Sequence, residues 1–240
     1  MTDGRRARGK TRRAAMAEQT AALASLDGLG AVSIARVADA IGAPKSSVQA
    51  AYPTKQDLQL AAVQAATETF VREVIKPALN TEEGLERLEA LIQSWLAYVE
   101  RRVFPGGCFM VANLAEFDSH PGPVRDALAT GRRQWLRALE RQARIAIDNG
   151  ALDPSPNSVQ RAFEIDALLA SANLDRNLNA SEEALHAAAE LIQLRLQPAQ
   201  KSDKRGRTAK TRPTPTVTMS HGRDATQRYP AADVPVEVSR

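Results

Sequence analysis

The sequence predicts an all-α protein with two short helices near its N-terminus and a larger helical body after them. From Arg13 to about Leu196 the chain is dominated by Ala, Leu, Glu, Gln and Arg, which favour helices. β-branched residues never alternate with polar ones as they would in a half-buried strand. Gly and Pro residues divide this stretch into about nine segments with apolar residues at helical spacing.

The first four segments have clear start and stop signals. A helix from Arg13 ends at Asp27-Gly28, and Ser33 is a good N-cap for a second, two-turn helix that stops at Gly42. After Pro44, a third short helix is expected from Lys45 to Tyr52. Thr54-x-x-Asp57 resembles a capping box and opens a longer fourth helix that reaches Lys76-Pro77.

The remaining five helices are expected to form the body. Their approximate ranges are 85–99, 108–117, 123–149, 158–178 and 181–197. Pro105-Gly106-Gly107 and Pro121-Gly122-Pro123 separate the first three of them. We therefore divide the chain into a basic disordered arm (1–12), a head of short helices (13–56), a helical body (57–197) and a Pro-rich, basic disordered tail (198–240).

Charge is distributed unevenly along the chain. Residues 1–60 contain nine Lys or Arg against five Asp or Glu, residues 61–197 contain 14 against 19, and residues 198–240 contain nine against four. Basic ends on an acidic body suit a polyanion contact, because clustered positive charge releases counterions from phosphates. The same pattern is also typical of basic ends that are only solvated and disordered.

Most enzyme and membrane classes lack support in this sequence. The single cysteine, Cys108, excludes an intrachain disulfide and a CxxC pair, and His120, His186 and His221 have no metal-binding spacing. There is no GxGxxG or GxxxxGK[ST] motif, so no cofactor, metal site or catalytic residue is expected. No apolar run approaches the roughly 20 residues of a membrane span, and a cytoplasmic protein is expected.

The two short helices need a specific explanation, since helices below about 12 residues are marginal in water. A helix-turn-helix supplies one, because its first helix braces the backbone and its second enters the DNA major groove. The αα-hairpin of an ordinary helical bundle fits the spacing equally well.

Individual residues distinguish these alternatives. Ser33, Val37-Ala38, Gly42, Lys45 and Tyr52-Pro53-Thr54-Lys55 occur in the order of the DNA-binding signature of TetR-family transcription regulators, which this segment resembles. Gly107-Cys108-Phe109, Ala115-Glu116-Phe117-Asp118 and Pro121-Gly122-Pro123 resemble the C-terminal domain of one branch of that family. The resemblance implies a repressor that binds a palindromic DNA operator as a homodimer through its last two helices and is released by a small-molecule effector.

The resemblance also implies which residues contact DNA. The expected set is Ser33, Lys45, Ser46, Ser47, Gln49, Ala50, Tyr52 and Lys55. The family usually has Tyr at the position of Gln49 and often His at that of Ala51. Gln49 can form two hydrogen bonds with adenine, whereas Ala50 and Ala51 offer few contacts. The alternative function is therefore a dimeric helical protein that binds a small molecule but has weak or lost sequence-specific DNA binding.

Bulky residues of the middle helices are candidates for the wall of a ligand cavity. They are Trp95, Phe104, Phe109, Met110, Phe117 and Trp135. Ordinary packing in the core is the competing interpretation for each of them.

Overall fold

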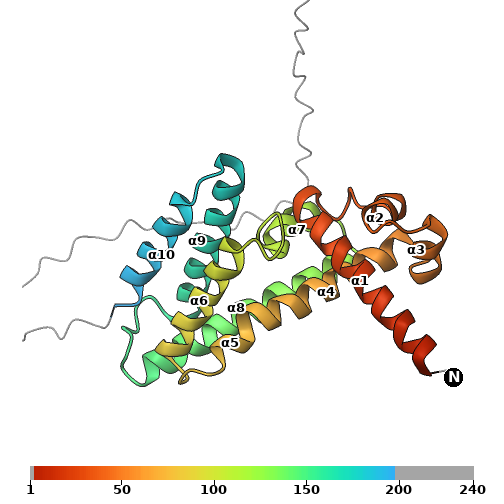
Figure 1. The fold of residues 1–240 in the computed structure, drawn as a ribbon. Helices are drawn as coiled ribbons and strands as arrows, with labels where there is room; N and C mark the ends of the chain where they lie inside the picture. Colours follow the sequence, from red (N-terminus) through yellow and green to blue (C-terminus); the bar gives the residue numbers. More distant parts are fainter. Residues whose placement is uncertain (1–2, 198–240) are drawn as a thin grey trace, which may run out of the picture. The chain divides into compact units, whose positions relative to one another are not determined.

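The structure, a computed structural model, describes residues 3–197, and all their regular secondary structure is helical (Figure 1). The elements are α1 (Asp3–Asp27), α2 (Ile34–Ala40), α3 (Lys45–Ala51), α4 (Lys55–Phe70), the π-helix η1 (Val71–Ile75), α5 (Lys76–Ala78), α6 (Leu85–Glu100), α7 (Phe109–Phe117), α8 (Pro123–Asp148), α9 (Ser158–Asn179) and α10 (Glu183–Arg195). Since α4, η1 and α5 follow one another without a break, the described part of the chain contains nine continuous helices, as predicted.

The N-terminus differs from the expectation. The basic segment 1–12 was expected to be a disordered arm, but α1 begins at Asp3 and includes residues 3–12. Arg, Lys and Ala favour helices, this segment contains no proline, and adding residues to an existing helix costs far less than nucleating one. The predicted tail at 198–240 lies outside the described residues. No described helix is both long and apolar enough to cross a membrane.

Helices α1 to α4 pack around a small core of their own. Helix α1 lies against α4, and α2 lies against α3. Leu29, Val37, Val48 and Leu58 are each fully buried in this core. The caps predicted from the sequence are present: the Ser33 hydroxyl accepts a hydrogen bond from the backbone of α2, and Thr54 and Asp57 form a reciprocal capping box.

The body is built around the long helix α8. Helix α8 packs against α4, α6, α7 and α9, and α10 packs on the outer side of α9 (Figure 1). Its core contains Leu88, Leu139, Ile165 and Leu169, all at most 1% exposed. Helix α4 contacts both α1 and α8, so it belongs to the head and the body at once.

Head and body also meet where backbone touches backbone. The Gly106 amide donates to the Ser25 hydroxyl over 3.0 Å, and a Cβ atom on Gly106 would lie only 1.8 Å from the Ser25 carbonyl oxygen. Only glycine fits there without displacing the end of α1. Residues 3–197 accordingly lie in one compact unit.

Candidate nucleic-acid interface and ligand cavity

The exposed face of α3 consists of small and polar side chains. Lys45, Ser46, Gln49 and Ala50 are exposed, Ser47 is half-buried, and Val48 anchors the helix in the core. Gly42 ends the preceding turn at φ +61°, in the left-handed region that the sequence predicted for it. The Gln49 amide has only a long hydrogen bond, 3.4 Å to the Pro53 carbonyl oxygen. Helix α3 therefore presents hydroxyl, amide and ammonium groups to the solvent.

Three other predicted contact residues have structural roles. Ser33 remains exposed while its hydroxyl caps α2. The ammonium group of Lys55, also exposed, donates to the Gly30 carbonyl oxygen and ties the loop after α1 to the start of α4.

Tyr52 differs from the expectation of a DNA-contacting side chain. It is 3% exposed, and its hydroxyl donates to the Arg13 carbonyl oxygen over 2.9 Å. Burial raises the pKa of Tyr52, and the Arg13 guanidinium lies 4.6 Å from the centre of its ring. Tyr52 thus links the end of α3 to α1 through its buried ring and its hydroxyl.

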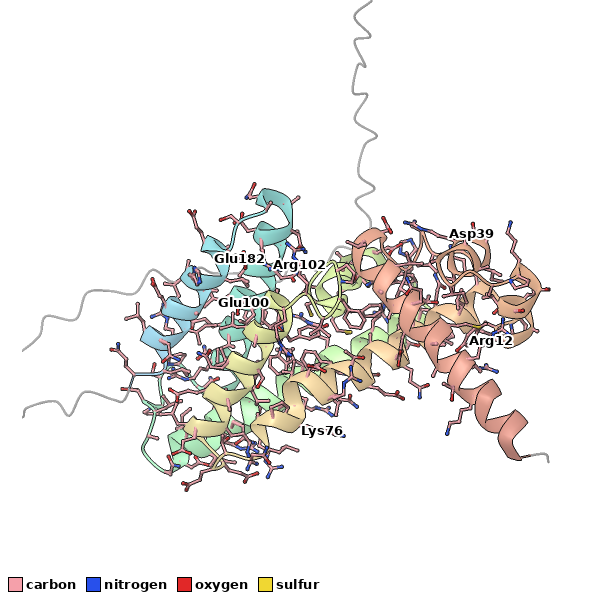
Figure 2. All side chains as sticks on the ribbon, in the orientation of Figure 1. Arg12, Asp39, Lys76, Glu100, Arg102 and Glu182 are labelled. Atoms are coloured by element: carbon pink, nitrogen blue, oxygen red, sulfur yellow. The ribbon has the colours of Figure 1, made fainter. Side chains whose placement is uncertain are left out.

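A basic groove runs between α1 and α3. Its walls are formed by Gly9, Lys10, Arg12, Arg13 and Met16 on α1 and by Ser47, Ala50 and Ala51 on α3. Figure 2 shows Arg12 on α1 at this end of the head. The sequence predicted basic residues near the N-terminus but not their alignment with α3, which depends on α1 continuing as a helix. This groove adds cationic groups beside the polar face of α3.

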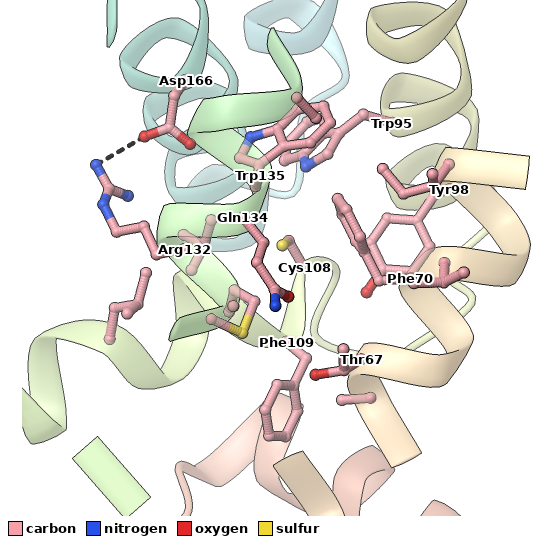
Figure 3. A pocket seen from close by; sticks show the side chains of 18 of the residues that line it. Thr67, Phe70, Trp95, Tyr98, Cys108, Phe109, Arg132, Gln134, Trp135 and Asp166 are labelled. Atoms are coloured by element: carbon pink, nitrogen blue, oxygen red, sulfur yellow. Dashed lines mark ion pairs between the residues drawn. The ribbon is translucent and has the colours of Figure 1, made fainter. Parts of the chain in front are cut away.

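The body contains a cavity of about 260 Å³ (Figure 3). Four of the six predicted residues line it, namely Trp95, Phe109, Met110 and Trp135. Phe70 and Tyr98 complete an aromatic wall that the sequence analysis missed: the ring centre of Phe70 is 5.8 Å from that of Tyr98 and 5.3 Å from that of Trp135, both edge to face. Both residues fit the apolar faces of their helices, so their spacing alone did not separate them from core residues.

The other two predicted residues lie elsewhere. Phe104 is buried behind the wall, with ring centres 6.2 Å from Tyr98 and 6.0 Å from Phe109. Phe117 lines a separate surface depression between α7 and α8, because it lies at the opposite end of α7 from Phe109.

Charged groups lie at one end of this aromatic cavity. Asp166 of α9 is 7% exposed and forms an ion pair with Arg132 of α8, with 2.7 Å between Oδ2 and Nη2 (Figure 3). Burial raises the pKa of Asp166, although Arg132 and the indole of Trp135 partly oppose this effect. Cys108 also lines the cavity, where complete burial raises the pKa of its thiol to about 11. A thiol in this state is a poor nucleophile at neutral pH.

Helix α7 connects the cavity to the head. Phe109, Met110 and Leu114 face the cavity, while Asn113 faces α1. The fully buried Asn113 side chain accepts from the Leu29 amide over 2.7 Å and donates to the Ala24 carbonyl oxygen over 3.2 Å.

The loop at Leu29 and Gly30 is held from both sides. Glu116 of α7 accepts from the Gly30 amide over 2.8 Å, and Gln59 of α4 donates to the Leu29 carbonyl oxygen over 2.9 Å. The loop that precedes α2 is thus clamped between α4 and α7, and both of these helices also line the cavity.

Among the described residues, no three His, Cys, Asp or Glu side chains lie close enough together to hold a metal ion.

Comparison with known proteins agrees with this architecture. Residues 84–192, from α6 to α10, match the model of the Tetracyclin repressor-like C-terminal domain. A search of curated proteins finds no matching sequence. Solved structures do share the fold, and 46 chains match with significance.

Three of these structures illustrate the likeness. A TetR-family transcriptional regulator from Agrobacterium tumefaciens has a TM-score of 0.72 at 18% identity, covering 80% of this chain and all of its own. A TetR transcriptional regulator from Chloroflexus aurantiacus has a TM-score of 0.71 at 20% identity, covering 77% of this chain and 93% of its own. AibR, solved in complex with isovaleryl coenzyme A and operator DNA, has a TM-score of 0.63 at 18% identity, covering 78% of this chain and all of its own.

Residues 84–192 thus match the Tetracyclin repressor-like C-terminal domain, and the described chain has the fold of TetR-family transcriptional regulators.

Proposed function

We propose that the protein is a transcriptional repressor that binds a palindromic DNA operator as a homodimer and is released by a small-molecule effector. The observation that carries this proposal is the clamped loop between α1 and α2, because it joins a polar, cation-flanked α3 to helices that line a cavity. The proposed division keeps a DNA-binding head at 13–56 and an effector-binding and dimerisation body at 57–197. It acts in the cytoplasm as a regulator without catalytic activity.

The DNA contacts follow from exposure. Lys45, Ser46 and Gln49 project from α3, where hydroxyl and amide groups can reach base edges and an ammonium can reach phosphate. Lys10 and Arg12 add phosphate contacts from the neighbouring groove. We assign four further residues to the edge of this contact, namely Ser33, Ser47, Ala50 and Lys55, and a supporting role within the core to Tyr52.

An apolar face on the last two helices supports the proposed homodimer. Val159, Phe163, Leu174 and Leu178 of α9 are 57–74% exposed, and Leu191 and Leu194 of α10 are 48% and 61% exposed. Their spacing of three, four and eleven residues places those of each helix on one face. A second copy of this chain covers that face and brings two α3 helices to neighbouring turns of the groove, about 34 Å apart.

A DNA-binding titration tests the repressor proposal. The full chain is titrated with the intergenic duplex that flanks its own gene and with a scrambled duplex, at two salt concentrations, by fluorescence anisotropy. We expect a preference for the flanking duplex on the order of a thousandfold. Lys45→Ala should weaken binding to both duplexes and reduce the salt slope by about one unit, whereas Gln49→Ala should mainly reduce the preference.

Lys76→Ala is the matched control, since it removes one exposed lysine from α5, away from α3 (Figure 2). If Lys45→Ala and Lys76→Ala behave alike, α3 does not enter the groove.

The small side chains on α3 favour a second candidate function. Ala50 is exposed and cannot form a side-chain hydrogen bond, and Lys55 and Tyr52 already have partners within the head. A dimeric ligand-binding protein with weak DNA specificity fits these facts. It predicts equal, strongly salt-dependent binding to both duplexes in the same titration.

A further inference from the structure

The polar groups of the cavity are unevenly placed. Aromatic and aliphatic side chains form most of the wall, and Arg132 and Asp166 lie together at one end (Figure 3). The Asp166 side chain is 10% exposed, while the Arg132 side chain is 36% exposed. The buried partner of this ion pair is therefore the carboxylate, and the guanidinium still reaches water.

The Asp166 carboxylate has unused capacity to accept hydrogen bonds. Arg132 forms an ion pair with Oδ2 over 2.7 Å, and this buried oxygen has no further partner. The Trp135 side chain donates to the same carboxylate. A carboxylate offers about four lone-pair positions, and a buried acceptor gains most from a donor that fills one of them.

The charge at this end selects against ionised ligands. Arg132 and Asp166 neutralise each other, and they are the only ionised pair among the residues of the wall. An ionised ligand there would lose its hydration, and it would meet a charge of its own sign in the pair as well as an opposite one. A neutral donor avoids both costs.

The volume limits the size of the ligand. A cavity of about 150 Å³ holds a benzene molecule, so 260 Å³ suits a compound of about two rings. A coenzyme A ester, with its nucleotide and phosphate groups, is too large to be enclosed. Flat rings also suit the edge-to-face aromatic wall formed by Phe70, Tyr98 and Trp135.

We infer that the effector is an uncharged aromatic compound of about two rings whose hydroxyl group donates a hydrogen bond to Asp166. This inference rests on the proposed function, in which an effector controls DNA binding. The aromatic wall encloses the rings, and Asp166 distinguishes this compound from an ether or hydrocarbon of the same shape.

Isothermal titration of the full chain with three matched probes tests this inference. The probes are 2-naphthol, 2-methoxynaphthalene, which lacks the donor, and 2-naphthoate, which is an anion. We expect 2-naphthol to bind about tenfold more tightly than 2-methoxynaphthalene, since a hydrogen bond to a charged group is worth about a factor of ten or more, and we expect 2-naphthoate to bind most weakly. Both tryptophans of the chain line the cavity, so a change in their fluorescence locates the bound probe.

Substitutions at Asp166 identify the acceptor. Asp166→Leu should bind 2-naphthol and 2-methoxynaphthalene equally. Asp166→Asn keeps the shape of the side chain and is therefore the variant to use if Asp166→Leu does not fold, and it should reduce the preference for 2-naphthol severalfold. Asp175→Asn is the control, because Asp175 is an exposed carboxylate on the same helix away from the cavity, and it should keep the tenfold preference.

Equal binding of the two neutral probes by the native chain would overturn the inference. Tightest binding of 2-naphthoate would also overturn it, as would the absence of binding by any probe at concentrations up to about 1 mM. Failure of the proposed function gives a different result: 2-naphthol would bind in the cavity with its preference intact, yet leave the affinity for the flanking duplex unchanged.

Discussion

Some single residues that match the DNA-binding signature also hold the helices of the head together. Tyr52 matches a DNA-binding signature in sequence, but its ring is buried and its hydroxyl joins α3 to the backbone of α1. Lys55 likewise connects the start of α4 to the loop after α1. A signature read from residue order therefore mixes side chains that are exposed on α3 with side chains that hold α3 in place.

Cys108 gives a test at the scale of one residue. Because its pKa is about 11, the thiolate fraction at pH 7 is about one in ten thousand, and its side chain is 3% exposed. We expect the native protein to react with a thiol reagent such as dithionitrobenzoate at least a hundredfold more slowly than the chain unfolded in guanidinium does. The unfolded chain provides the control, since it should release one equivalent of product. Rapid labelling of the native protein would show that Cys108 is an accessible, reactive thiol.

At the scale of an element, α7 has two distinct faces. One face lines the cavity, and the other holds Leu29 and Gly30 through Asn113 and Glu116. A ligand that displaces α7 relative to α4 must therefore change the loop ahead of α2. The coupling has a short physical path, because each step is a side-chain to backbone hydrogen bond or a packed residue of one helix.

Asn113→Ala tests this path. The substitution leaves the buried Leu29 amide without an acceptor, which should cost about 1–3 kcal/mol of the free energy of unfolding. It should also reduce the effect of a bound ligand on DNA affinity by at least threefold. Gln142→Ala is the matched control, since buried Gln142 accepts from the Gly84 amide over 2.9 Å entirely within the body.

Urea unfolding and anisotropy titrations with and without ligand separate the two effects. Both variants should lose similar stability, and only Asn113→Ala should lose coupling. Equal loss of coupling in the two variants would assign the effect to general destabilisation.

Helices α9 and α10 give a second test at this scale. Phe163→Glu places a charge in the middle of the exposed apolar face, so we expect the dimer to dissociate, with the dissociation constant raised at least a hundredfold. Leu79→Glu is the control, because Leu79 is 56% exposed but follows α5. Sedimentation equilibrium measures both variants. A dimer that survives Phe163→Glu, or that Leu79→Glu dissociates equally, would place the interface elsewhere.

At the scale of the whole molecule, acid should destabilise the fold through paired carboxylates. The Arg176 guanidinium holds the pKa of Glu182 below its usual value of 4.5, and Arg72 and then Arg101 do the same for Glu73. Arg176 is buried and also donates to the carbonyl oxygens of Val99 and Glu100, which links α9 to the end of α6. Figure 2 shows Glu100, Arg102 and Glu182 at this junction.

The sign of the pH effect follows from these directions. Each lowered pKa contributes stability that is present above about pH 4.5 and is lost as the pH falls through the folded-state pKa. Asp166 acts in the opposite direction, because its raised pKa favours the folded state when it is protonated.

We expect calorimetry to show that Tm falls between about pH 5 and pH 3. Glu182→Gln should have a smaller fall over this range than the native chain, whereas the exposed control Glu190→Gln should follow the native chain. An unchanged pH dependence in Glu182→Gln would show that this pair contributes nothing to acid sensitivity.

The sequence predicted the helices well because their ends carry local chemical signals. Ser33, Gly42, Thr54 and Asp57 act at the positions assigned to them, and these signals depend only on a few neighbouring residues. The fold class and the family resemblance were both confirmed. The start of α1 was missed, because an Arg-rich segment has the composition of a solvated arm as well as of a helix.

The site was less predictable because it depends on contacts between distant residues. Asn113 reaches Leu29 across 84 positions of the chain, and Phe70 meets Trp135 from another helix. The π-helix η1 also escapes prediction, yet it brings Val71 and Ile75 to the cavity wall. Nothing in the spacing around these residues separates them from ordinary core positions.

The contact of Gly106 with Ser25 determines which segments of this fold can be exchanged between relatives. A chimera that joins the head of this protein to the body of a relative would place a foreign residue opposite the end of α1, and any side chain there would force the two parts apart. A workable exchange would have to transfer the 104–117 segment together with the head. The unit that can be exchanged between relatives is therefore larger than the head of short helices, and it includes a piece of the body that lines the cavity.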